Sequence, residues 1–347
     1  MDRNKELFSA LVAASALGAA EGVLRLRDRA NSRTRFLRER WTLERTWERF
    51  DPKSGWELKP GFVSDYVRIN RNGFRGPELI KGDFQKVICL GDSLTFGSAG
   101  EKNTYPDSLQ IELAKICTGR PVEVINAGVS GHTTYNMLFR LKRIMRFRPD
   151  VVIILAGWND LYEETITRYQ DNRQPFSSFW HIESKKNVRF HVWSLLCETI
   201  RSKNRKPFPL SYISDEFVPF NFEYNLTKII DCIRKYSAEA VLVTLPNLIP
   251  DDLSLMPPED RKKILLPNFI EEGDLESFLK VFRSYDTIIR ALASEKEVPL
   301  IDTEKMFVEP EISRGSLFED SHHLNAEGYC RLGRFIAGEL KEKGLLV

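Results

Sequence analysis

Several features that mark particular protein classes are scarce in this sequence. It has few cysteines, an odd number of them, widely spaced and without a C-x-x-C pair: Cys89, Cys117, Cys197, Cys232 and Cys330. The sequence therefore predicts neither a disulfide framework nor a cysteine-ligated zinc site. Lysine and arginine (51) nearly balance aspartate and glutamate (49), and the net charge is +2. This balance argues against a nucleic-acid partner, because such proteins usually carry a strong basic excess.

Motifs for common cofactors are also missing. The sequence has no G-x-x-x-x-G-K-[ST] phosphate-binding loop and no H-E-x-x-H pair. A P-loop nucleotide site and a helix-borne zinc protease site are therefore disfavoured. We expect a protein that needs no cofactor and no metal.

The N-terminal region lacks a hydrophobic run of normal membrane-spanning length. Residues 7–20 (LFSALVAASALGAA) are weakly apolar and end at Glu21, short of the roughly 20 residues that a span needs. Arginines at 25–29 would oppose export of the chain after them. Two interpretations of residues 1–30 stay open. They form a membrane anchor or signal segment of a membrane-anchored or exported protein, or a soluble helix of a cytoplasmic one.

Residues 31–85 have the character of a helical and extended lead-in. Between residues 33 and 50, apolar side chains recur every three to four positions, which predicts an amphipathic helix. Residues 56–80 are expected to be extended, with a tight turn at Asn72-Gly73.

From residue 86 to 347 the sequence has the pattern of an α/β domain. Short apolar strands alternate with helical stretches, which is typical of a parallel sheet. Helices are expected at 105–117 and 326–340, and two connections, 160–238 and 245–298, are long enough to wall a ligand crevice. The expected strands are 86–90, 122–125, 151–155, 240–244 and 299–301.

Polar residues follow the first three of these strands. Gly91-Asp92-Ser93 comes after the first strand, residues 126–131 after the second, and residues 157–160 after the third. The carboxyl ends of parallel strands meet at one edge of a sheet, where such folds bind ligands. A fourth polar group, residues 320–325, precedes the last expected helix.

Together these four segments resemble the sequence blocks of the SGNH, or GDSL, hydrolase family. The matching stretches are GDSLTFG, NAGVSGHTT, GWND and DSHHLN, in this order, and the resemblance extends over residues 87–340. The preceding VRINRNGFRGPEL is also similar to a segment of bacterial members, some of which have an N-terminal hydrophobic helix. The resemblance implies a flavodoxin-like three-layer sandwich around a five-stranded parallel sheet, and ester-cleaving or acyl-transferring chemistry.

The chemistry that this family uses fits the residue types present. A serine hydroxyl such as Ser93 becomes a good nucleophile when a neighbouring base takes its proton, and the neutral pKa of histidine suits that base. The resemblance points to His323 as the base and to Asp320 as the group that orients it. It also implies an oxyanion hole formed by the Ser93 N–H, the Gly131 N–H and the Asn159 side-chain amide.

Two of these assignments have competitors in the sequence. Gly128 is a second candidate for the backbone donor, although the family spacing, five residues after Asn126, favours Gly131. His322 competes with His323 as the base. The Asp-x-x-His spacing favours His323 and leaves His322 as a pocket-lining or solvent residue.

Other residues of the blocks have structural interpretations. Asp92 is expected to organise the turn after the first strand, and His132 to line the pocket or to lie on the surface. No G-x-S-x-G surrounds Ser93, because Thr95 occupies the last position, so the nucleophile elbow of α/β hydrolases is disfavoured.

The sequence therefore predicts a serine-dependent ester hydrolase, with a short-chain acyl ester or an O-acyl carbohydrate as substrate. An O-acyltransferase with the same site and a catalytically silent binding module of the same fold are the alternatives. A nucleotide or flavin binder is disfavoured by the missing phosphate loop. The oligomeric state is left open.

Overall fold

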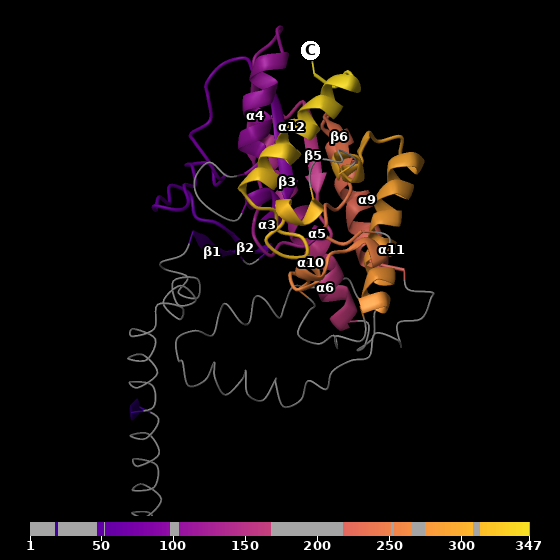
Figure 1. Ribbon diagram of the computed structural model, residues 1–347. Helices are drawn as coiled ribbons and strands as arrows, with labels where there is room; N and C mark the ends of the chain where they lie inside the picture. Colours follow the sequence, from indigo (N-terminus) through magenta and orange to yellow (C-terminus); the bar gives the residue numbers. More distant parts are fainter. Residues whose placement is uncertain are drawn as a thin grey trace, which may run out of the picture.

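The computed structural model describes residues 18–19, 47–51, 53–97, 104–167, 218–250, 253–265, 275–307 and 313–346. Its centre is a five-stranded parallel sheet in the order β4-β3-β5-β6-β7, with helices packed around it (Figure 1). This confirms the expected α/β fold. The strands are β3 (Gln85–Gly91), β4 (Val122–Asn126), β5 (Val151–Leu155), β6 (Glu239–Val243) and β7 (Leu300–Ile301).

The strands form where the sequence has continuous apolar runs. All five side chains of β5 are buried, as are most of those in β3. Burial on both faces is characteristic of a parallel sheet covered by helices on each side. Each end of an expected strand either agrees with the observed end or differs from it by one residue.

Helices cover the two faces of the sheet in pairs. The chain steps from β3 to β4 through α4 (Tyr105–Ile116) and then back to β5 through α5 (Thr134–Ile144). Because such crossovers are right-handed, steps in opposite directions place α4 and α5 on opposite faces. The last helix, α12 (Ala326–Glu342), packs on α4, and α9 (Phe220–Lys235) packs on α5.

The ends of the expected helices follow capping rules. The Thr104 side chain accepts a hydrogen bond from the Asp107 N–H at the start of α4, at 3.2 Å. Asn325 does the same for the Gly328 N–H at the start of α12, at 3.0 Å. The remaining helical segments are α3 (Ser93–Phe96), η1 (Met145–Phe147), α6 (Trp158–Thr167), η3 (Leu253–Leu255), α10 (Pro258–Arg261), α11 (Leu275–Glu295), η5 (Thr303–Phe307) and η6 (Arg314–Leu317).

The lead-in forms a hairpin where a helix was expected. Strand β1 (Glu48–Asp51) pairs antiparallel with β2 (Gly55–Leu58), so the prediction of a helix up to residue 50 is wrong at its end. The Asp51 carboxylate accepts the N–H groups of Lys53 and Ser54, both at 2.9 Å, and so stabilises the turn. Hydrogen bonding between strands therefore prevails over the helical spacing of apolar residues. Residues 33–46 of the expected helix lie outside the described part of the chain.

The turn at Asn72-Gly73 is confirmed. The Gly73 N–H donates to the Asn70 carbonyl at 3.0 Å, and Gly73 has a φ of 81°, which glycine adopts without strain. Ile69 and Arg75 pair across this turn.

The hairpin and the segment after it share a core with the loops of the α/β domain. Phe96 at the end of α3 and Val129 in the loop after β4 form a small hydrophobic cluster, separate from the main core, with four lead-in residues: Trp56, Leu58, Val67 and Ile69. Glu57 of β2 also forms a buried ion pair with Arg140 of α5. Residues 47–84 are thus packed against the sheet domain.

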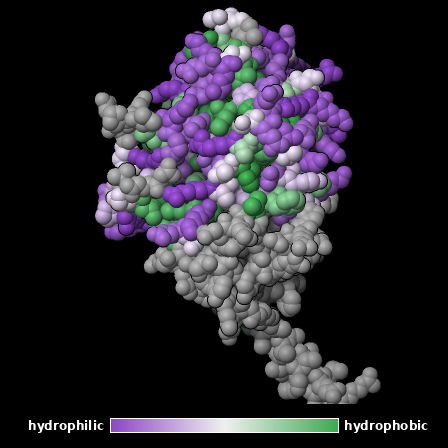
Figure 2. Space-filling view, turned by 90° about the vertical axis from the view of Figure 1, so that its right-hand side faces the viewer, coloured by the Kyte–Doolittle hydropathy of each residue, from purple (hydrophilic) through white to green (hydrophobic). Residues whose placement is uncertain are grey.

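The two long connections contain helices of their own. Helix α6 extends into 160–238 and α9 lies within it, whereas residues 168–217 of this connection, which was expected to wall a ligand crevice, lie outside the described residues. Helices α10 and α11 lie within 245–298. The face that α9 and α11 form is mainly hydrophilic, with hydrophobic side chains in small groups (Figure 2).

The expected N-terminal apolar run, residues 7–20, is described only at residues 18–19. Among the helices that the structure describes, none combines the length and the hydropathy that crossing a bilayer requires.

Candidate active site

The candidate nucleophile lies at the carboxyl end of a central strand. Ser93 is the first residue of α3, two residues after β3 ends at Gly91. The buried Asp92 carboxylate accepts the Leu94 N–H at 2.9 Å, which agrees with its expected role as organiser of this turn. Burial raises the pKa of Asp92 to about 6, although the hydrogen bond from Leu94 and the charge of His323 act in the opposite direction.

A chain of hydrogen bonds connects Ser93 to the segment before α12. Ser93 Oγ lies 3.0 Å from His323 Nε2, and His323 Nδ1 lies 2.7 Å from Asp320 Oδ2. The other Asp320 oxygen accepts the backbone N–H groups of His322, at 3.0 Å, and His323, at 2.8 Å. The structure therefore brings together Ser93, His323 and Asp320, which are up to 230 residues apart in sequence.

The same contacts explain the electrostatics of the pair. Burial alone would raise the pKa of Asp320, but the hydrogen bond from His323 and the charge of that ring hold it well below its usual range. Burial alone would lower the pKa of His323, whereas the hydrogen bond and the negative charge of Asp320 raise it above its ordinary value. An ionised Asp320 thus favours a proton on His323 Nδ1 and leaves Nε2 free to accept the serine proton.

His322 neither lines the pocket nor faces solvent, so that expectation is wrong. Its ring is buried and stacks on Trp158, with ring centroids 4.5 Å apart. Its Nδ1 atom is 3.5 Å from Asp320 Oδ1. Burial and the neighbouring charge of His323 lower the pKa of His322 to about 3, despite the opposing effect of Asp320. His322 is therefore neutral, and its buried ring packs against the ring of His323, with centroids 4.0 Å apart.

The donors expected for an oxyanion hole follow the carboxyl ends of three adjacent strands, β3, β4 and β5. Within the described residues, the backbone N–H groups of Ser93 and Gly131 donate to no protein acceptor. The competing Gly128 N–H donates to Asn126 Oδ1 at 3.0 Å, which occupies it. The Asn159 amide donates to His132 O at 3.2 Å and to an oxygen of Asp92 at 3.3 Å. One of these long contacts must open before that amide can bind a substrate oxygen.

The candidate site residues are partly exposed, whereas the residues next to them in sequence are buried. Ser93, Gly131, Asn159 and His323 are partly exposed. Their immediate neighbours in sequence, which hold the loops in place, are buried: Asp92, His132, Asp160 and His322. The interpretation of His132 as a pocket-lining or surface residue is therefore wrong. Its Nε2 atom lies 2.9 Å from the Trp56 carbonyl oxygen.

Two tryptophans that the sequence reasoning did not single out support the site. Trp158 belongs to the quoted GWND stretch and stacks on His322. Trp56 belongs to the lead-in, and its indole N–H donates to the Ser130 carbonyl at 3.0 Å. Because Trp158 is next to the candidate site residue Asn159 in sequence, its place near the site could have been predicted. Trp56 and Ser130 are 74 positions apart, and no local sequence pattern indicates their contact.

The ligand atoms of Asp320, His322 and His323 lie within 4.8 Å of one another, which is close enough for a metal ion. The short hydrogen bond between Asp320 and His323, however, already uses two of these atoms. The burial of the His322 ring also restricts access to the third. The arrangement fits a hydrogen-bonded carboxylate–histidine pair better than a metal site.

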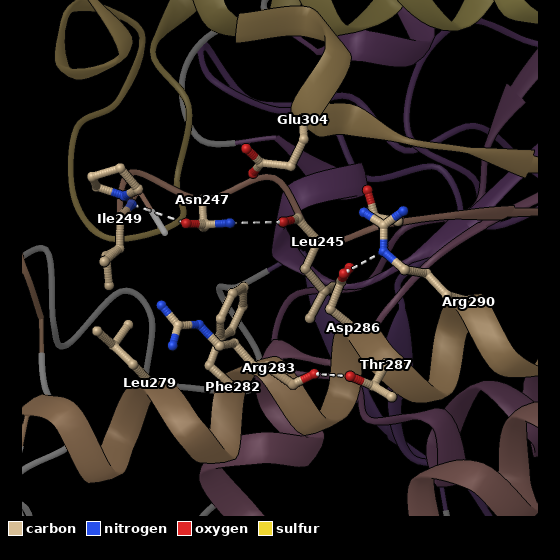
Figure 3. Close-up of a pocket in the computed structure, with 12 residues that line it drawn as sticks. Leu245, Asn247, Ile249, Leu279, Phe282, Arg283, Asp286, Thr287, Arg290 and Glu304 are labelled. Carbon is tan, nitrogen blue, oxygen red and sulfur yellow. Dashed lines mark hydrogen bonds and ion pairs between the residues drawn. The ribbon is translucent and has the colours of Figure 1, made fainter. Parts of the chain in front are cut away.

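A cleft of about 360 Å³ lies between α11 and the loop after β6 (Figure 3). Phe282 lines it and stacks on Trp158, so the cleft is connected through that ring to the packing around His322. Several of its polar side chains are paired with one another, as Arg290 is with Asp286 at 2.7 Å. The side chains of the Ser93–His323–Asp320 chain are not among its lining residues.

Comparison with known proteins places the chain in a family. Residues 89–331 match the GDSL-like Lipase/Acylhydrolase family. An uncharacterized lipoprotein, YqeF, of Bacillus subtilis is 22% identical over 259 residues, which cover 71% of this chain and 85% of that protein. An arylesterase of Vibrio mimicus is 38% identical over 78 residues, 22% of this chain and 38% of the arylesterase.

Two solved structures were also found in the comparison. A lipase/acylhydrolase from Enterococcus faecalis has 21% identity and a TM-score of 0.45, with 75% of this chain and 97% of that chain covered. Axe2, an acetyl-xylooligosaccharide esterase from Geobacillus, has 18% identity and a TM-score of 0.46, with 75% and 95% covered. The family match spans Ser93, Gly131, Asn159, Asp320 and His323. The chain therefore belongs to the GDSL-like lipase/acylhydrolase, or SGNH, family and is an ester hydrolase.

Proposed function

We propose that this ester hydrolase acts through a catalytic triad of Ser93, His323 and Asp320. The observation that carries the proposal is the 3.0 Å contact between Ser93 Oγ and His323 Nε2, continued by the 2.7 Å contact to Asp320. A nucleophile, a base and a group that orients the base, each within hydrogen-bond reach of the next, are the requirements of this mechanism.

In the first half of the reaction, Ser93 Oγ attacks the ester carbonyl carbon while its proton passes to His323 Nε2. The carbonyl electrons move onto the oxygen and form a tetrahedral oxyanion. When that intermediate collapses, His323 returns the proton to the departing alcohol, and the acyl group remains on Ser93. Water then attacks the acyl carbon, again with His323 as base, and releases the acid.

The oxyanion would bind to the N–H groups of Ser93 and Gly131. Both are at the carboxyl edge of the sheet and have no acceptor among the described residues. The Asn159 amide supplies the third donor once it leaves His132 O or Asp92. Donors that point to the developing charge lower the barrier, because the charge is larger in the transition state than in the substrate.

The substrates that we propose are esters of short acyl groups, including O-acyl groups on carbohydrates. Similarity to the Vibrio mimicus arylesterase supports activity on small esters. An alcohol in place of water in the second half of the reaction would make the enzyme an O-acyltransferase with the same site. Incubation of acetylated xylooligosaccharide with and without an alcohol acceptor separates the two, since only the transferase forms a new ester.

The test of the mechanism compares the wild type with Ser93→Ala on p-nitrophenyl acetate. Loss of the nucleophile should lower kcat by about 10⁴-fold or more. Ser294→Ala is the matched control, because Ser294 is exposed on α11, and its kcat should remain that of the wild type. Equal rates for wild type and Ser93→Ala would contradict the serine mechanism. Two inactive proteins, also on acetylated xylooligosaccharide, would favour the silent binding module.

We also propose that residues 1–30 export or anchor the protein, in line with the similarity to a protein named as a lipoprotein. Fractionation of cells that express the full chain or a chain that starts at residue 31 tests this. Recovery of both chains in the cytoplasmic fraction would leave the cytoplasmic alternative.

A further inference from the structure

The peptide that joins Ser130 to Gly131 is held by a residue from the N-terminal hairpin. The Trp56 indole Nε1–H donates to the Ser130 carbonyl oxygen at 3.0 Å. Trp56 lies in β2, and its side chain is fully buried. This part-buried hydrogen bond from a buried indole fixes both the loop and the ring, because the indole N–H is the protein donor that the Ser130 carbonyl has.

This bond also sets the direction of the Gly131 N–H. The peptide unit is planar, and the described residues contain no cis peptide bond. The carbonyl oxygen of Ser130 and the N–H of Gly131 therefore lie in the same plane and point in opposite directions. When Trp56 holds the oxygen, the N–H must point away from the indole.

Gly131 needs such support because its own conformation is unusual. Its φ is 76°, a region that glycine enters as easily as the normal one. A glycine peptide can therefore rotate at low cost unless something outside it holds it. The Gly131 N–H has no acceptor in the described part of the protein, so its own hydrogen bonding does not hold the peptide.

A second contact holds the other side of Gly131. The backbone carbonyl of Trp56 lies 2.9 Å from His132 Nε2, and the two rings meet edge to face with centroids 5.1 Å apart. One residue of the hairpin thus contacts residue 130 through its side chain and residue 132 through its backbone. The glycine between them is bracketed.

We propose that Trp56 is a positioning residue for the oxyanion hole, which orients the Gly131 N–H through the Ser130 carbonyl. This inference rests on the proposed serine mechanism, in which that N–H stabilises the oxyanion. It assigns a catalytic consequence to the lead-in, which lies outside the residues 89–331 that match the family.

A packing role alone predicts a different result. Trp56 shares its cluster with Leu58, Val67, Ile69, Phe96 and Val129, so any truncation in the cluster should lower stability. Only loss of the indole N–H should release the peptide. The oxyanion exists in the transition state and not in the bound ester. A misplaced Gly131 N–H should therefore lower kcat and kcat/KM together and leave KM unchanged.

The decisive variant is Trp56→Phe, which keeps an aromatic ring and removes the N–H. We expect kcat on p-nitrophenyl acetate to fall by about 10- to 100-fold, less than the 10²- to 10³-fold that complete loss of an oxyanion donor causes. Leu58→Ala is the matched control, since it truncates the same cluster and keeps the bond to Ser130. Its kcat should stay within about threefold of the wild type at a temperature where urea unfolding shows it folded.

A second variant keeps the test decisive if Trp56→Phe folds poorly. Incorporation of the benzothiophene analogue of tryptophan at position 56 preserves the bicyclic shape and replaces only the N–H by sulfur. It should show the same loss of kcat with near wild-type stability. Wild-type kcat in a folded Trp56 variant, or a loss no larger than that of Leu58→Ala, would overturn the inference. If the wild type itself shows no Ser93-dependent hydrolysis, the proposed mechanism fails first and the inference fails with it.

Discussion

If the proposed mechanism is correct, replacement of Asp320 by asparagine should disable His323 as a base without removing its side chain. In the wild type, Asp320 Oδ1 accepts two backbone N–H groups and Oδ2 accepts the proton of His323 Nδ1 at 2.7 Å. Asparagine can keep the first oxygen and its two bonds. The second oxygen becomes an NH₂ group, which cannot face an Nδ1–H. His323 then moves its proton to Nε2, 3.0 Å from Ser93 Oγ, and can no longer accept the serine proton there.

The size of the effect follows from this change of tautomer. The corresponding change in another serine hydrolase lowers kcat by about 10⁴-fold. At about 1.36 kcal/mol for each tenfold change, this corresponds to about 5.4 kcal/mol of barrier. The pH at which the residual kcat rises should be lower than in the wild type. The reason is that the carboxylate that raises the pKa of His323 is gone.

Stability should change with pH in a matching way. The lowered pKa of Asp320 contributes stability above its unfolded value, about 3.9, and this contribution is lost as the pH falls through the folded pKa. The raised pKa of His323 contributes stability below its unfolded value, about 6.5, and this is lost as the pH rises through the folded pKa. The wild type should therefore exceed Asp320→Asn in free energy of unfolding most clearly near pH 5, and less at pH 9.

The assay is the kcat–pH profile on p-nitrophenyl acetate together with urea unfolding at pH 5 and pH 9. Asp302→Asn is the control, because Asp302 pairs with Arg290 at 2.8 Å and is absent from the triad. It should lose stability and keep its kcat. A fall of less than tenfold in kcat for Asp320→Asn, or an unchanged pH profile, would refute the role of Asp320 as the group that orients His323.

Two further predictions concern the packing around the site. Arg140→Met leaves Glu57 buried without its main cation and should lower the free energy of unfolding by about 3 to 5 kcal/mol. Urea titrations at pH 7 measure this change, and a loss under about 1 kcal/mol would contradict the importance of the pair. Gly128→Ala would place a Cβ 2.2 Å from the Phe96 backbone nitrogen in α3, and should cost about 1 to 3 kcal/mol of stability and reduce kcat. The control Gly338→Ala has no atom within 4 Å and should match the wild type in both measurements.

The sheet could be predicted because its signal is local. Each strand is a short run of apolar residues, and both faces of the sheet are covered, so the run is continuous and easy to recognise. Strand β5 was expected at 151–155 and is found there. The polar residues at the strand ends could also be found, because parallel strands bring their carboxyl ends to one edge.

The parts that sequence reasoning missed depend on contacts between distant residues. The strand at Glu48–Asp51 exists because it pairs with β2, and its aromatic spacing alone suggested a helix. The buried state of His132 comes from Trp56, 76 residues away. His322 is buried because α6 brings Trp158 against it. The two histidine contacts cannot be predicted from the local pattern of hydrophobic and polar residues.

The distance along the chain between Ser93 and His323 affects when their contact can form. His323 stands just before α12, and α12 packs on α4. Because 230 residues separate the two side chains, the turn that carries Ser93 is synthesised well before the segment that carries His323. Under the mechanism that we propose, ester cleavage would begin only once α12 has packed and this contact is made.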